Sequence, residues 1–198
     1  MYILIFIIGL ISGIILNYAI DSISYSITKT KGKTMNIVIP ITCGFSFEVL
    51  FLRLGFTSIL AKAVVMTAIL IIISFIDLRH RIIPNFMVVI ALIIGIVFSF
   101  MVRASFIDTI FGMVSGGGIL FLLALFPNAM GGGDIKLMFA IGSFLGLNRT
   151  VWALLLAFIM SSIISIGLIL FRIKGTKDYI PFGPFLALGS FISLLIFI

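Results

Sequence analysis

Two aspartates carry the most specific chemical signal in the sequence. Asp77 ends one long apolar stretch, and Asp134 begins another. Two carboxyl groups that are held close together cannot both ionise easily, so they share a proton. In that state one carboxylate can activate water while the other carboxylic acid protonates a carbonyl oxygen. If the two residues meet in the fold, they offer the chemistry that aspartic proteases use.

Three glycines come immediately before Asp134, at Gly131, Gly132 and Gly133. Each would destabilise a helix by about 1 kcal/mol relative to alanine, so their position before an apolar stretch needs a reason. Glycines allow positive φ and close backbone approach, which would let an extended substrate lie beside the carboxylate. The alternative is a flexible loop in which Asp134 is the N-cap of the next helix.

A basic turn follows Asp77 and contains Arg79, His80 and Arg81, with Pro84 close behind. Proline suits the first turn of a helix, so a new helix is expected near Pro84. Asp77 could instead be an interfacial charge that pairs with one of the two arginines. His80 is more typical of a solvated loop residue than of a metal ligand.

Other catalytic chemistries find little support. The chain has one histidine and one cysteine, which argues against a zinc site and a nucleophilic triad, so we expect no metal and no cofactor. We expect Cys43 to be a small apolar helix residue.

Glu48 lies within an apolar stretch, where a carboxyl group is costly and by default a functional candidate. It could face water, stay protonated or pair with a basic residue. A structural role is favoured, but the sequence does not define it.

The composition places these residues in a membrane. Of the 198 residues 63% are apolar and only 10% are charged, and the mean hydropathy is +1.43. Soluble domains average about 45–50% apolar and about 25% charged residues. The apolar stretches are too continuous for the alternating pattern of a barrel strand, so helices are expected. We predict an all-α, polytopic membrane protein in which residues 1–198 form one domain.

About eight transmembrane helices fit the sequence. We place them at Ile3–Ile20, Ile37–Leu54, Ile59–Ile76, Pro84–Val102, Ile107–Phe126, Ile135–Leu147, Val151–Phe171 and Phe182–Ile198. The sixth has about 13 residues and would reach only about 20 Å. We expect either that the preceding loop extends it or that it lies at an angle among other helices. The longest polar segment, Asp21–Asn36, is expected to be a short loop.

Basic residues set the orientation of these helices. With eight alternating spans, one side of the membrane receives Lys29, Lys31, Lys33, Arg79, Arg81, Lys136, Arg172, Lys174 and Lys177, and the other receives Arg53, Lys62, Arg103 and Arg149. The side richer in lysine and arginine is expected in the cytoplasm. Two crossings separate Asp77 from Asp134, so both lie on that side and both termini lie outside. The net charge of +7 is thus explained by topology, and we expect lipid but no nucleic acid as a partner.

Three blocks in order along the chain resemble the type IV prepilin peptidases, a family of membrane aspartyl proteases. The blocks are Ile76-Asp77-Leu78 with Ile83-Pro84-Asn85, then Gly131–Leu137, and then Pro181–Gly189. The resemblance implies that Asp77 and Asp134 are catalytic. It also implies that residues around them bind substrate or shape the site, namely Gly131, Gly132, Gly133, Lys136, Pro84, Asn85, Pro181 and Gly183.

The resemblance also implies a substrate and a place of action. The enzyme would be an aspartic endopeptidase of the cytoplasmic (inner) membrane. It would remove the basic leader of type IV prepilins or pseudopilins at the cytoplasmic face. The sequence does not identify the prepilin, the pilus, competence or secretion system, or the oligomeric state.

The chain departs from larger members of this family. They carry a four-cysteine cytoplasmic domain after the first span, whereas the corresponding stretch Asp21–Asn36 has no cysteine. Glu48 is also out of register with the glutamate of their usual Pro-x-x-Glu motif. The chain resembles a short form of the family, and we expect weak or no N-methyltransferase activity.

Two other interpretations remain open. A presenilin-like intramembrane protease also uses a Gly-x-Gly-Asp motif, but the Ile-Pro-Asn and Pro-Phe-Gly-Pro blocks argue against it. A transporter or assembly component would carry polar residues near mid-membrane in broken, repeated spans. Only Glu48 hints at that arrangement.

Overall fold

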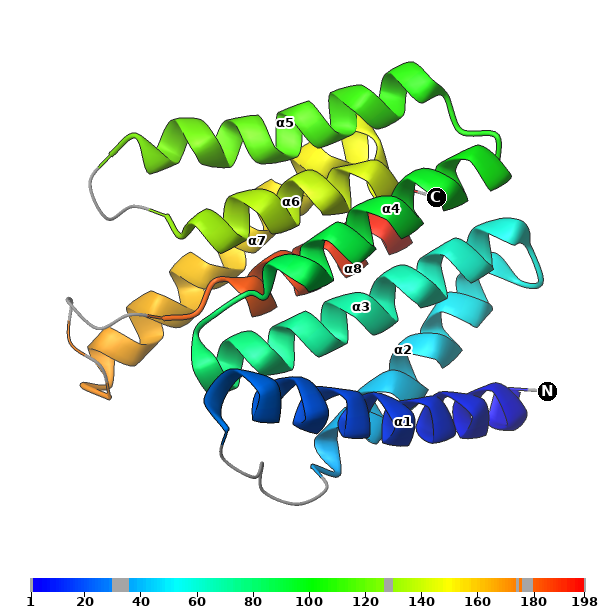
Figure 1. Cartoon of the computed structure of the whole chain (residues 1–198), viewed down its shortest axis with the longest axis horizontal. Coiled ribbons are helices and arrows are strands. Elements are labelled where there is room, and N and C mark those ends of the chain that lie inside the picture. The colour runs from blue at the N-terminus through cyan, green and yellow to red at the C-terminus, as the bar shows by residue number, and fades with distance from the viewer. Residues whose placement is uncertain (1, 30–35, 127–129, 174, 176–179, 198) are drawn as a thin grey trace.

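A computed structural model describes residues 2–29, 36–126, 130–173, 175 and 180–197. In these ranges the protein has eight helices and no strand (Figure 1). The helices are α1 (Tyr2–Thr28), α2 (Val38–Leu54), α3 (Ser58–His80), α4 (Asn85–Met101), α5 (Phe106–Ala124), α6 (Gly132–Leu145), α7 (Leu147–Leu170) and α8 (Gly183–Ile196). The prediction of an all-α fold with eight helices is confirmed.

Four helices, α1, α3, α5 and α7, are long and apolar enough to cross a membrane, and α4 and α8 are shorter apolar helices. Large apolar side chains cover the outside of the molecule, with Ile3 at 77% and Leu170 at 76% exposure. A surface of this kind is costly in water and suits lipid. The fold is that of a polytopic membrane protein.

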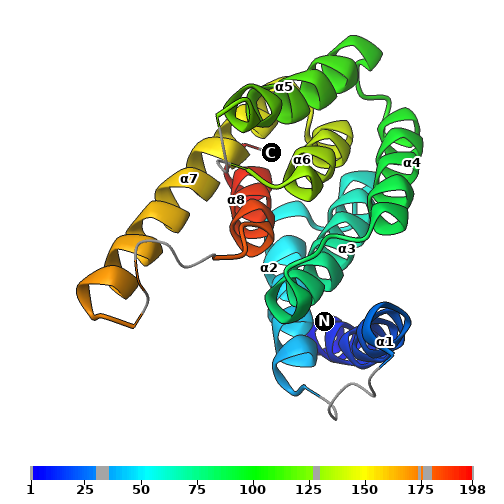
Figure 2. The same cartoon turned by 60° about the vertical axis from the view of Figure 1, so that its left-hand side comes forward.

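Successive helices run in opposite directions, and the pairs α1 with α2, α5 with α6 and α7 with α8 pack most extensively (Figures 1 and 2). As a result, the end of α3 and the starts of α4, α6 and α8 lie at the same end of the bundle, on the left in Figure 1. Asp77 and Asp134 belong to these helix ends. Two helices, α4 and α5, lie between the helices that carry the two aspartates, and they return the chain to the same end of the bundle, as predicted.

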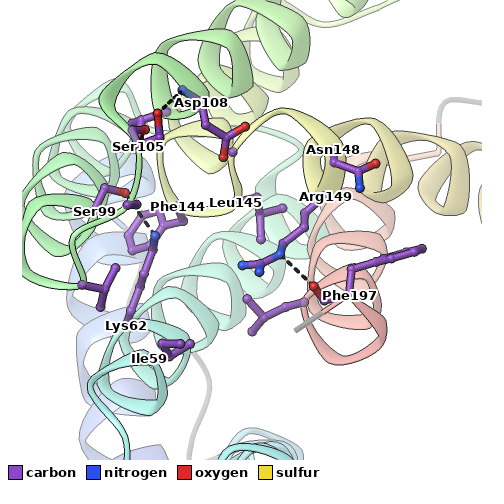
Figure 3. Close-up of a pocket in the computed structure, with 15 residues that line it drawn as sticks. Ile59, Lys62, Ser99, Ser105, Asp108, Phe144, Leu145, Asn148, Arg149 and Phe197 are labelled. Atoms are coloured by element: carbon purple, nitrogen blue, oxygen red, sulfur yellow. Dashed lines mark hydrogen bonds between the residues drawn. The ribbon is translucent and has the colours of Figure 1, made fainter.

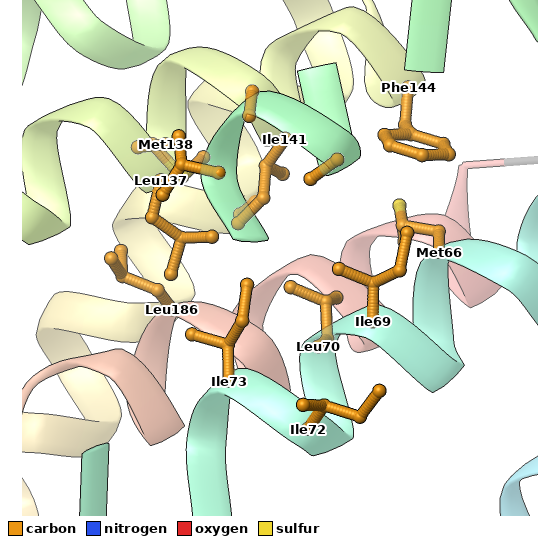
Figure 4. Close-up of a cluster of buried hydrophobic side chains, with 14 of the residues drawn as sticks. Met66, Ile69, Leu70, Ile72, Ile73, Leu137, Met138, Ile141, Phe144 and Leu186 are labelled. Carbon is orange, nitrogen blue, oxygen red and sulfur yellow. The ribbon is translucent and has the colours of Figure 1, made fainter. Parts of the chain in front are cut away.

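Helix α6 is short, as expected, and runs inside the protein. Nine of its 14 residues are buried, and it begins at Gly132, within the glycine run. Its core side chains Leu137, Met138 and Ile141 face Leu70 and Ile73 of α3 and Leu186 of α8 (Figure 4). Apolar burial drives helix association weakly in lipid, where close van der Waals packing matters more. This packing fixes the spacing between α3 and α6, the helices that carry the two aspartates.

Small residues let helix backbones approach closely. A Cβ atom added to Gly9 of α1 would lie 2.6 Å from Cα of Gly44 in α2. Gly112 of α5 and Gly142 of α6 meet backbone to backbone in the same way. Contacts between small residues are the usual means by which membrane helices associate.

The first helix is longer than predicted. It continues to Thr28, so Asp21 lies on α1 and not in a loop. Its carboxylate accepts a hydrogen bond of 2.6 Å from Arg79 at the end of α3. This ion pair offsets the cost of continuing the helix past Ile20 with polar residues. Lys31 and Lys33, which the loop was expected to contain, lie outside the described residues.

Basic residues end several helices in a left-handed conformation. All four non-glycine residues with positive φ in the described ranges are lysine or arginine: Lys29 (55°), Arg81 (56°), Arg103 (53°) and Arg172 (55°). Each follows the last residue of a helix by one or two positions. A left-handed conformation costs about 1–2 kcal/mol for a residue with a Cβ atom. A cation near a helix C-terminus gains from the helix dipole, which offsets part of that cost.

Candidate active site

Asp77 lies in the last turn of α3, and its side chain is buried with 3% exposure. Its Oδ2 accepts a hydrogen bond of 3.0 Å from the backbone N–H of Gly183, at the start of α8. Its backbone carbonyl accepts from the N–H of Arg81, 2.8 Å away, which closes the helix. Asp77 is therefore held from two sides.

The approach of α8 to Asp77 depends on Gly183. A Cβ atom at this position would lie 2.7 Å from Oδ2 of Asp77, too close for any side chain. Pro181 is buried just before it, and Phe182 is the N-cap of α8. The block around Pro181 and Gly183 thus places the start of α8 against the carboxylate. The Gly183 N–H is the donor there, because Pro184 has no N–H and that of Phe185 binds the carbonyl of Phe182.

Asp134 is the third residue of α6 and is buried with 4% exposure. Its backbone N–H donates to the carbonyl of Gly131, 3.1 Å away. Its carboxylate interacts with the backbone N–H of Gly131, as an acidic residue at the third helical position commonly does. The alternative in which Asp134 is the N-cap is therefore wrong, because Gly131 holds that position.

The carboxyl groups of Asp77 and Asp134 are close enough for their charges to interact, and both are withdrawn from solvent. Asp77 forms no ion pair within the described residues, since Arg79 binds Asp21 instead. Repulsion and burial both oppose a state in which the two groups are ionised together. The arrangement favours one proton shared by the pair.

The three glycines act differently from the prediction. None of Gly131, Gly132 and Gly133 has a positive φ; Gly131 is extended, with φ −77° and ψ 140°, and the other two begin α6. A Cβ atom at Gly133 would lie 3.1 Å from Cβ of Ile83, so this glycine allows close packing. A Cβ atom at Gly132 would meet only open space. Close packing therefore explains Gly133, and none of the three glycines is explained by a positive φ.

Other residues of the three blocks surround the aspartates. Pro84 is buried and is the N-cap of α4. The helix therefore begins at Asn85, one residue after the start of the predicted span. Nζ of Lys136, in α6, donates to Oδ1 of Asn85 at a distance of 3.1 Å, on the surface. This contact ties the start of α4 to the start of α6. All the predicted site residues thus lie at one end of the bundle.

His80 differs from its prediction as a solvated loop residue. It is the last residue of α3 and is half-buried, and its Nε2 is buried with no hydrogen-bond partner among the described residues. Within the same ranges, no three His, Cys, Asp or Glu side chains gather where they could hold a metal ion.

Glu48 lies on α2 and is half-buried. In the part of the chain that the structure describes, it has no ion-pair partner, so pairing with a basic residue, one of the three alternatives, is not found there. Cys43 is fully buried on the same helix, as predicted.

An apolar cavity of about 360 Å³ adjoins the site. It lies between α2, α3 and α8, and Ser74, Phe75 and Pro184 line the part nearest the aspartates. Ser74 is about one helical turn before Asp77, and Pro184 follows Gly183 directly. No pattern in the sequence predicts this cavity, because its lining residues come from three separate helices.

The chain is similar to proteins named prepilin leader peptidase/N-methyltransferase. It is 34% identical to one from Aeromonas hydrophila over 67% of this chain and 48% of that protein. It is 32% identical to one from Legionella pneumophila over 89% of this chain and 61% of that protein. It is 33% identical to one from Pseudomonas aeruginosa over 71% of this chain and 51% of that protein. The chain therefore spans about half to three fifths of the length of these relatives.

No solved structure matches the chain significantly. The model of the type IV leader peptidase family matches residues 64–166, which include both aspartates. The chain belongs to the type IV leader peptidase family.

Proposed function

We propose that the chain is an aspartic endopeptidase that removes leader peptides from prepilins or pseudopilins, with Asp77 and Asp134 as its catalytic pair. The observation that carries this proposal is the burial of two interacting carboxyl groups in a chain of the type IV leader peptidase family. The relatives it matches are named prepilin leader peptidases, which supports the substrate class.

The chemistry follows from one proton shared between the two aspartates. The ionised carboxylate takes a proton from water as the water oxygen bonds to the peptide carbonyl carbon. The protonated partner gives its proton to the carbonyl oxygen, which forms a neutral tetrahedral diol. The C–N bond then breaks as the departing amine takes a proton from the protonated carboxyl group. The other carboxylate takes a proton from one diol hydroxyl, whose oxygen forms the new C=O bond, and the pair again shares one proton. The Gly183 N–H binds one oxygen of Asp77, so the other stays available for water.

The surroundings of the pair suit a peptide substrate. Open space above Gly132 leaves room for an extended backbone to pass beside Asp134. The apolar cavity near Ser74 and Pro184 would take apolar side chains next to the cleaved bond. In this proposal the remaining predicted site residues shape the site by fixing the starts of α4, α6 and α8. They are Gly131, Gly133, Lys136, Pro84, Asn85, Pro181 and Gly183.

We propose that the site faces the cytoplasm. Among the described residues, the helix ends near the aspartates carry Lys29, Arg79, Arg81, Lys136 and Arg172, and the opposite ends carry Arg53, Lys62, Arg103 and Arg149. Lys174 and Lys177, which were also predicted on the cytoplasmic side, lie outside the described residues. The positive-inside rule favours this orientation, with both termini outside.

Single cysteines at Arg81 and Arg103 test the orientation in a Cys43→Ser background. The two positions are matched, since both are exposed and both follow a helix end. A membrane-impermeant thiol reagent should label intact cells at position 103 and only lysed cells at position 81. The reverse pattern would put the aspartates on the outer face.

Incubation of the purified protein with candidate prepilins in detergent tests the activity itself. Mass spectrometry should find one new N-terminus directly after the basic leader. Cleavage within the apolar segment would indicate an intramembrane protease instead, and no cleavage of any prepilin would contradict the proposal. Adding S-adenosylmethionine with a labelled methyl group tests the expected weak or absent N-methyltransferase activity in the same samples.

A further inference from the structure

The end of the bundle opposite the aspartates contains a cavity of about 380 Å³ (Figure 3). Helices α3, α4, α5 and α8 and the junction of α6 with α7 line it. Its charged lining residues are Lys62, Asp108 and Arg149. The mechanism proposed above uses none of them.

Lys62 is buried with 7% exposure, although it carries a charged group. Nζ donates a hydrogen bond of 3.1 Å to Oγ of Ser99, which in turn donates to the carbonyl of Ser143, 2.7 Å away. A lysine ammonium has three donors, so this network uses one of them. Lys62 has no carboxylate within ion-pair distance among the described residues.

Arg149, in the first turn of α7, extends into the same cavity (Figure 3). Nε donates to the backbone carbonyl of Phe197 at 3.1 Å, an uncharged partner. Within the described ranges Arg149 also forms no ion pair. Its charge and that of Lys62 interact unfavourably across the cavity.

Among the described residues that line the cavity, Asp108 supplies the one negative charge, but its carboxylate is already engaged. Oδ1 accepts a hydrogen bond of 3.0 Å from the N–H of Leu147, and the carboxylate lies against Gly146. It therefore stabilises the N-terminus of α7. The three charged side chains among the described lining residues sum to one positive charge, and one of them, Lys62, is buried. Buried charges are costly unless a partner compensates them.

We propose that this cavity binds a phosphate-type oxyanion between Nζ of Lys62 and the guanidinium of Arg149. Arginine binds phosphate through two parallel N–H groups, and lysine adds a compact charge. Within the described part of the chain, the remaining donors of both side chains have no partner, so they can bind the oxygens. Ile59, Val102 and Leu194 add an apolar part to a wall that also contains Ser105, Thr109 and Asn148. A wall of this mixed kind also fits the glycerol region of a phospholipid. The anion is therefore either a lipid headgroup or free phosphate, and this proposal does not depend on the proposed peptidase function.

Binding to the full chain in nanodiscs tests the proposal, with two matched arms. One arm compares phosphatidylglycerol with phosphatidylcholine at constant total lipid, and native mass spectrometry counts the retained lipid. The other adds inorganic phosphate to protein in phosphatidylcholine and records the affinity by phosphorus NMR. Retention of phosphatidylglycerol alone would identify the headgroup, and saturable phosphate binding alone would identify the free anion. If neither is bound, the proposal is wrong.

Variants locate the binding. Lys62→Gln and Arg149→Gln should each weaken it about 10-fold or more, because each removes a hydrogen bond to a charged group. Lys62→Arg should retain most of it. Asp108→Asn should strengthen it, since Asn can still accept from Leu147 but removes the competing negative charge. Arg103→Gln is the control, because Arg103 is exposed at the same end but does not line the cavity. Unchanged affinity in both Lys62→Gln and Arg149→Gln would overturn the assignment. If one of the two variants folds poorly, the affinity of the other still tests it.

Discussion

Both ends of the helix bundle have an aspartate near the start of a helix, but Asp134 is buried whereas Asp108 is exposed, and the two aspartates have different partners. At one end Asp108 accepts the N–H of Leu147 and faces two cations, Lys62 and Arg149. At the other end Asp134 has a second carboxyl group, Asp77, as its charged neighbour. A carboxylate beside cations is stabilised in one charge state, whereas a pair of carboxyl groups can exchange a proton. The charged neighbours and the burial of the carboxyl group, and not the helix position, separate a structural acid from a candidate catalytic one.

The largest effect expected from this comparison concerns the aspartate pair. Asp77→Asn and Asp134→Asn should each lower the rate of leader removal by about 1,000-fold or more, because an amide can neither take nor share the proton. The double variant should be little worse than either single variant, since groups that act as a unit are not additive. Initial rates of prepilin cleavage in detergent measure this.

Asp108→Asn is the matched control at the opposite end and should cleave at a rate close to that of the wild type. Asp21→Asn is the control on the aspartate side; Asp178, also on that predicted side, lies outside the described residues. Loss of activity in Asp21→Asn together with retention in Asp77→Asn or Asp134→Asn would show that the wrong carboxylates were chosen.

The next effect tests how Asp77 is positioned. Gly183→Ala should slow cleavage by about 100-fold, because the new Cβ atom displaces either the carboxylate or the start of α8. Gly118→Ala is the control, since a Cβ atom there has no neighbour within 4 Å. Cleavage rates and the thermal unfolding midpoint should be compared for both. A fully active Gly183→Ala enzyme would mean that close contact between α8 and Asp77 is dispensable.

A smaller effect is expected where the substrate is proposed to pass. Gly132→Ala should leave stability unchanged, because a Cβ atom there faces open space, but it should raise KM about 10-fold by crowding the peptide. Gly133→Ala should instead lower the unfolding midpoint, because its Cβ atom would press on Ile83. If Gly132→Ala had wild-type KM, the substrate path would have to lie elsewhere.

The smallest effect should come from the ion pair between Asp21 and Arg79. Their side chains are 27% and 24% exposed, so solvent weakens the interaction. Arg79→Gln should destabilise the protein by about 1 kcal/mol or less and leave cleavage nearly unchanged. A large loss of activity without a loss of stability would instead give Arg79 a role in the site.

Much of this organisation could be predicted from the sequence, because each apolar stretch is recognised from its own residues. Counting the stretches between two residues then shows whether both lie on the same side of the membrane. Eight stretches predict eight helices, and two crossings between Asp77 and Asp134 predict one side. The hydrogen bond from Gly183 to Asp77 could not be predicted, since it depends on how α8 packs against α3. The cavity lined by Lys62 and Arg149 could not be predicted for the same reason, since it depends on how several helices pack together. Charge counting put both on one side of the membrane, but it contained no information on which helices meet.

The extension of α1 to Thr28 was missed for a different reason. Polar residues from Asp21 onward suggested a loop, because the span was delimited by apolar composition. A helix can continue past the edge of the hydrocarbon wherever its polar side chains find partners, as Asp21 does with Arg79. Composition therefore predicts where a segment leaves lipid, but not where its helix ends.

The left-handed lysine and arginine residues after α1, α3, α4 and α7 also have a consequence for membrane insertion. At each of these sites a basic residue lies one or two positions past the last helical residue and carries a charge that favours water over lipid. A helix with this terminus cannot slide along its axis during insertion without either dragging a cation into lipid or rewinding its last turn. For α3, whose end carries Asp77, the result is that Arg81 sets the depth of the carboxylate in the bilayer while the chain is still being threaded.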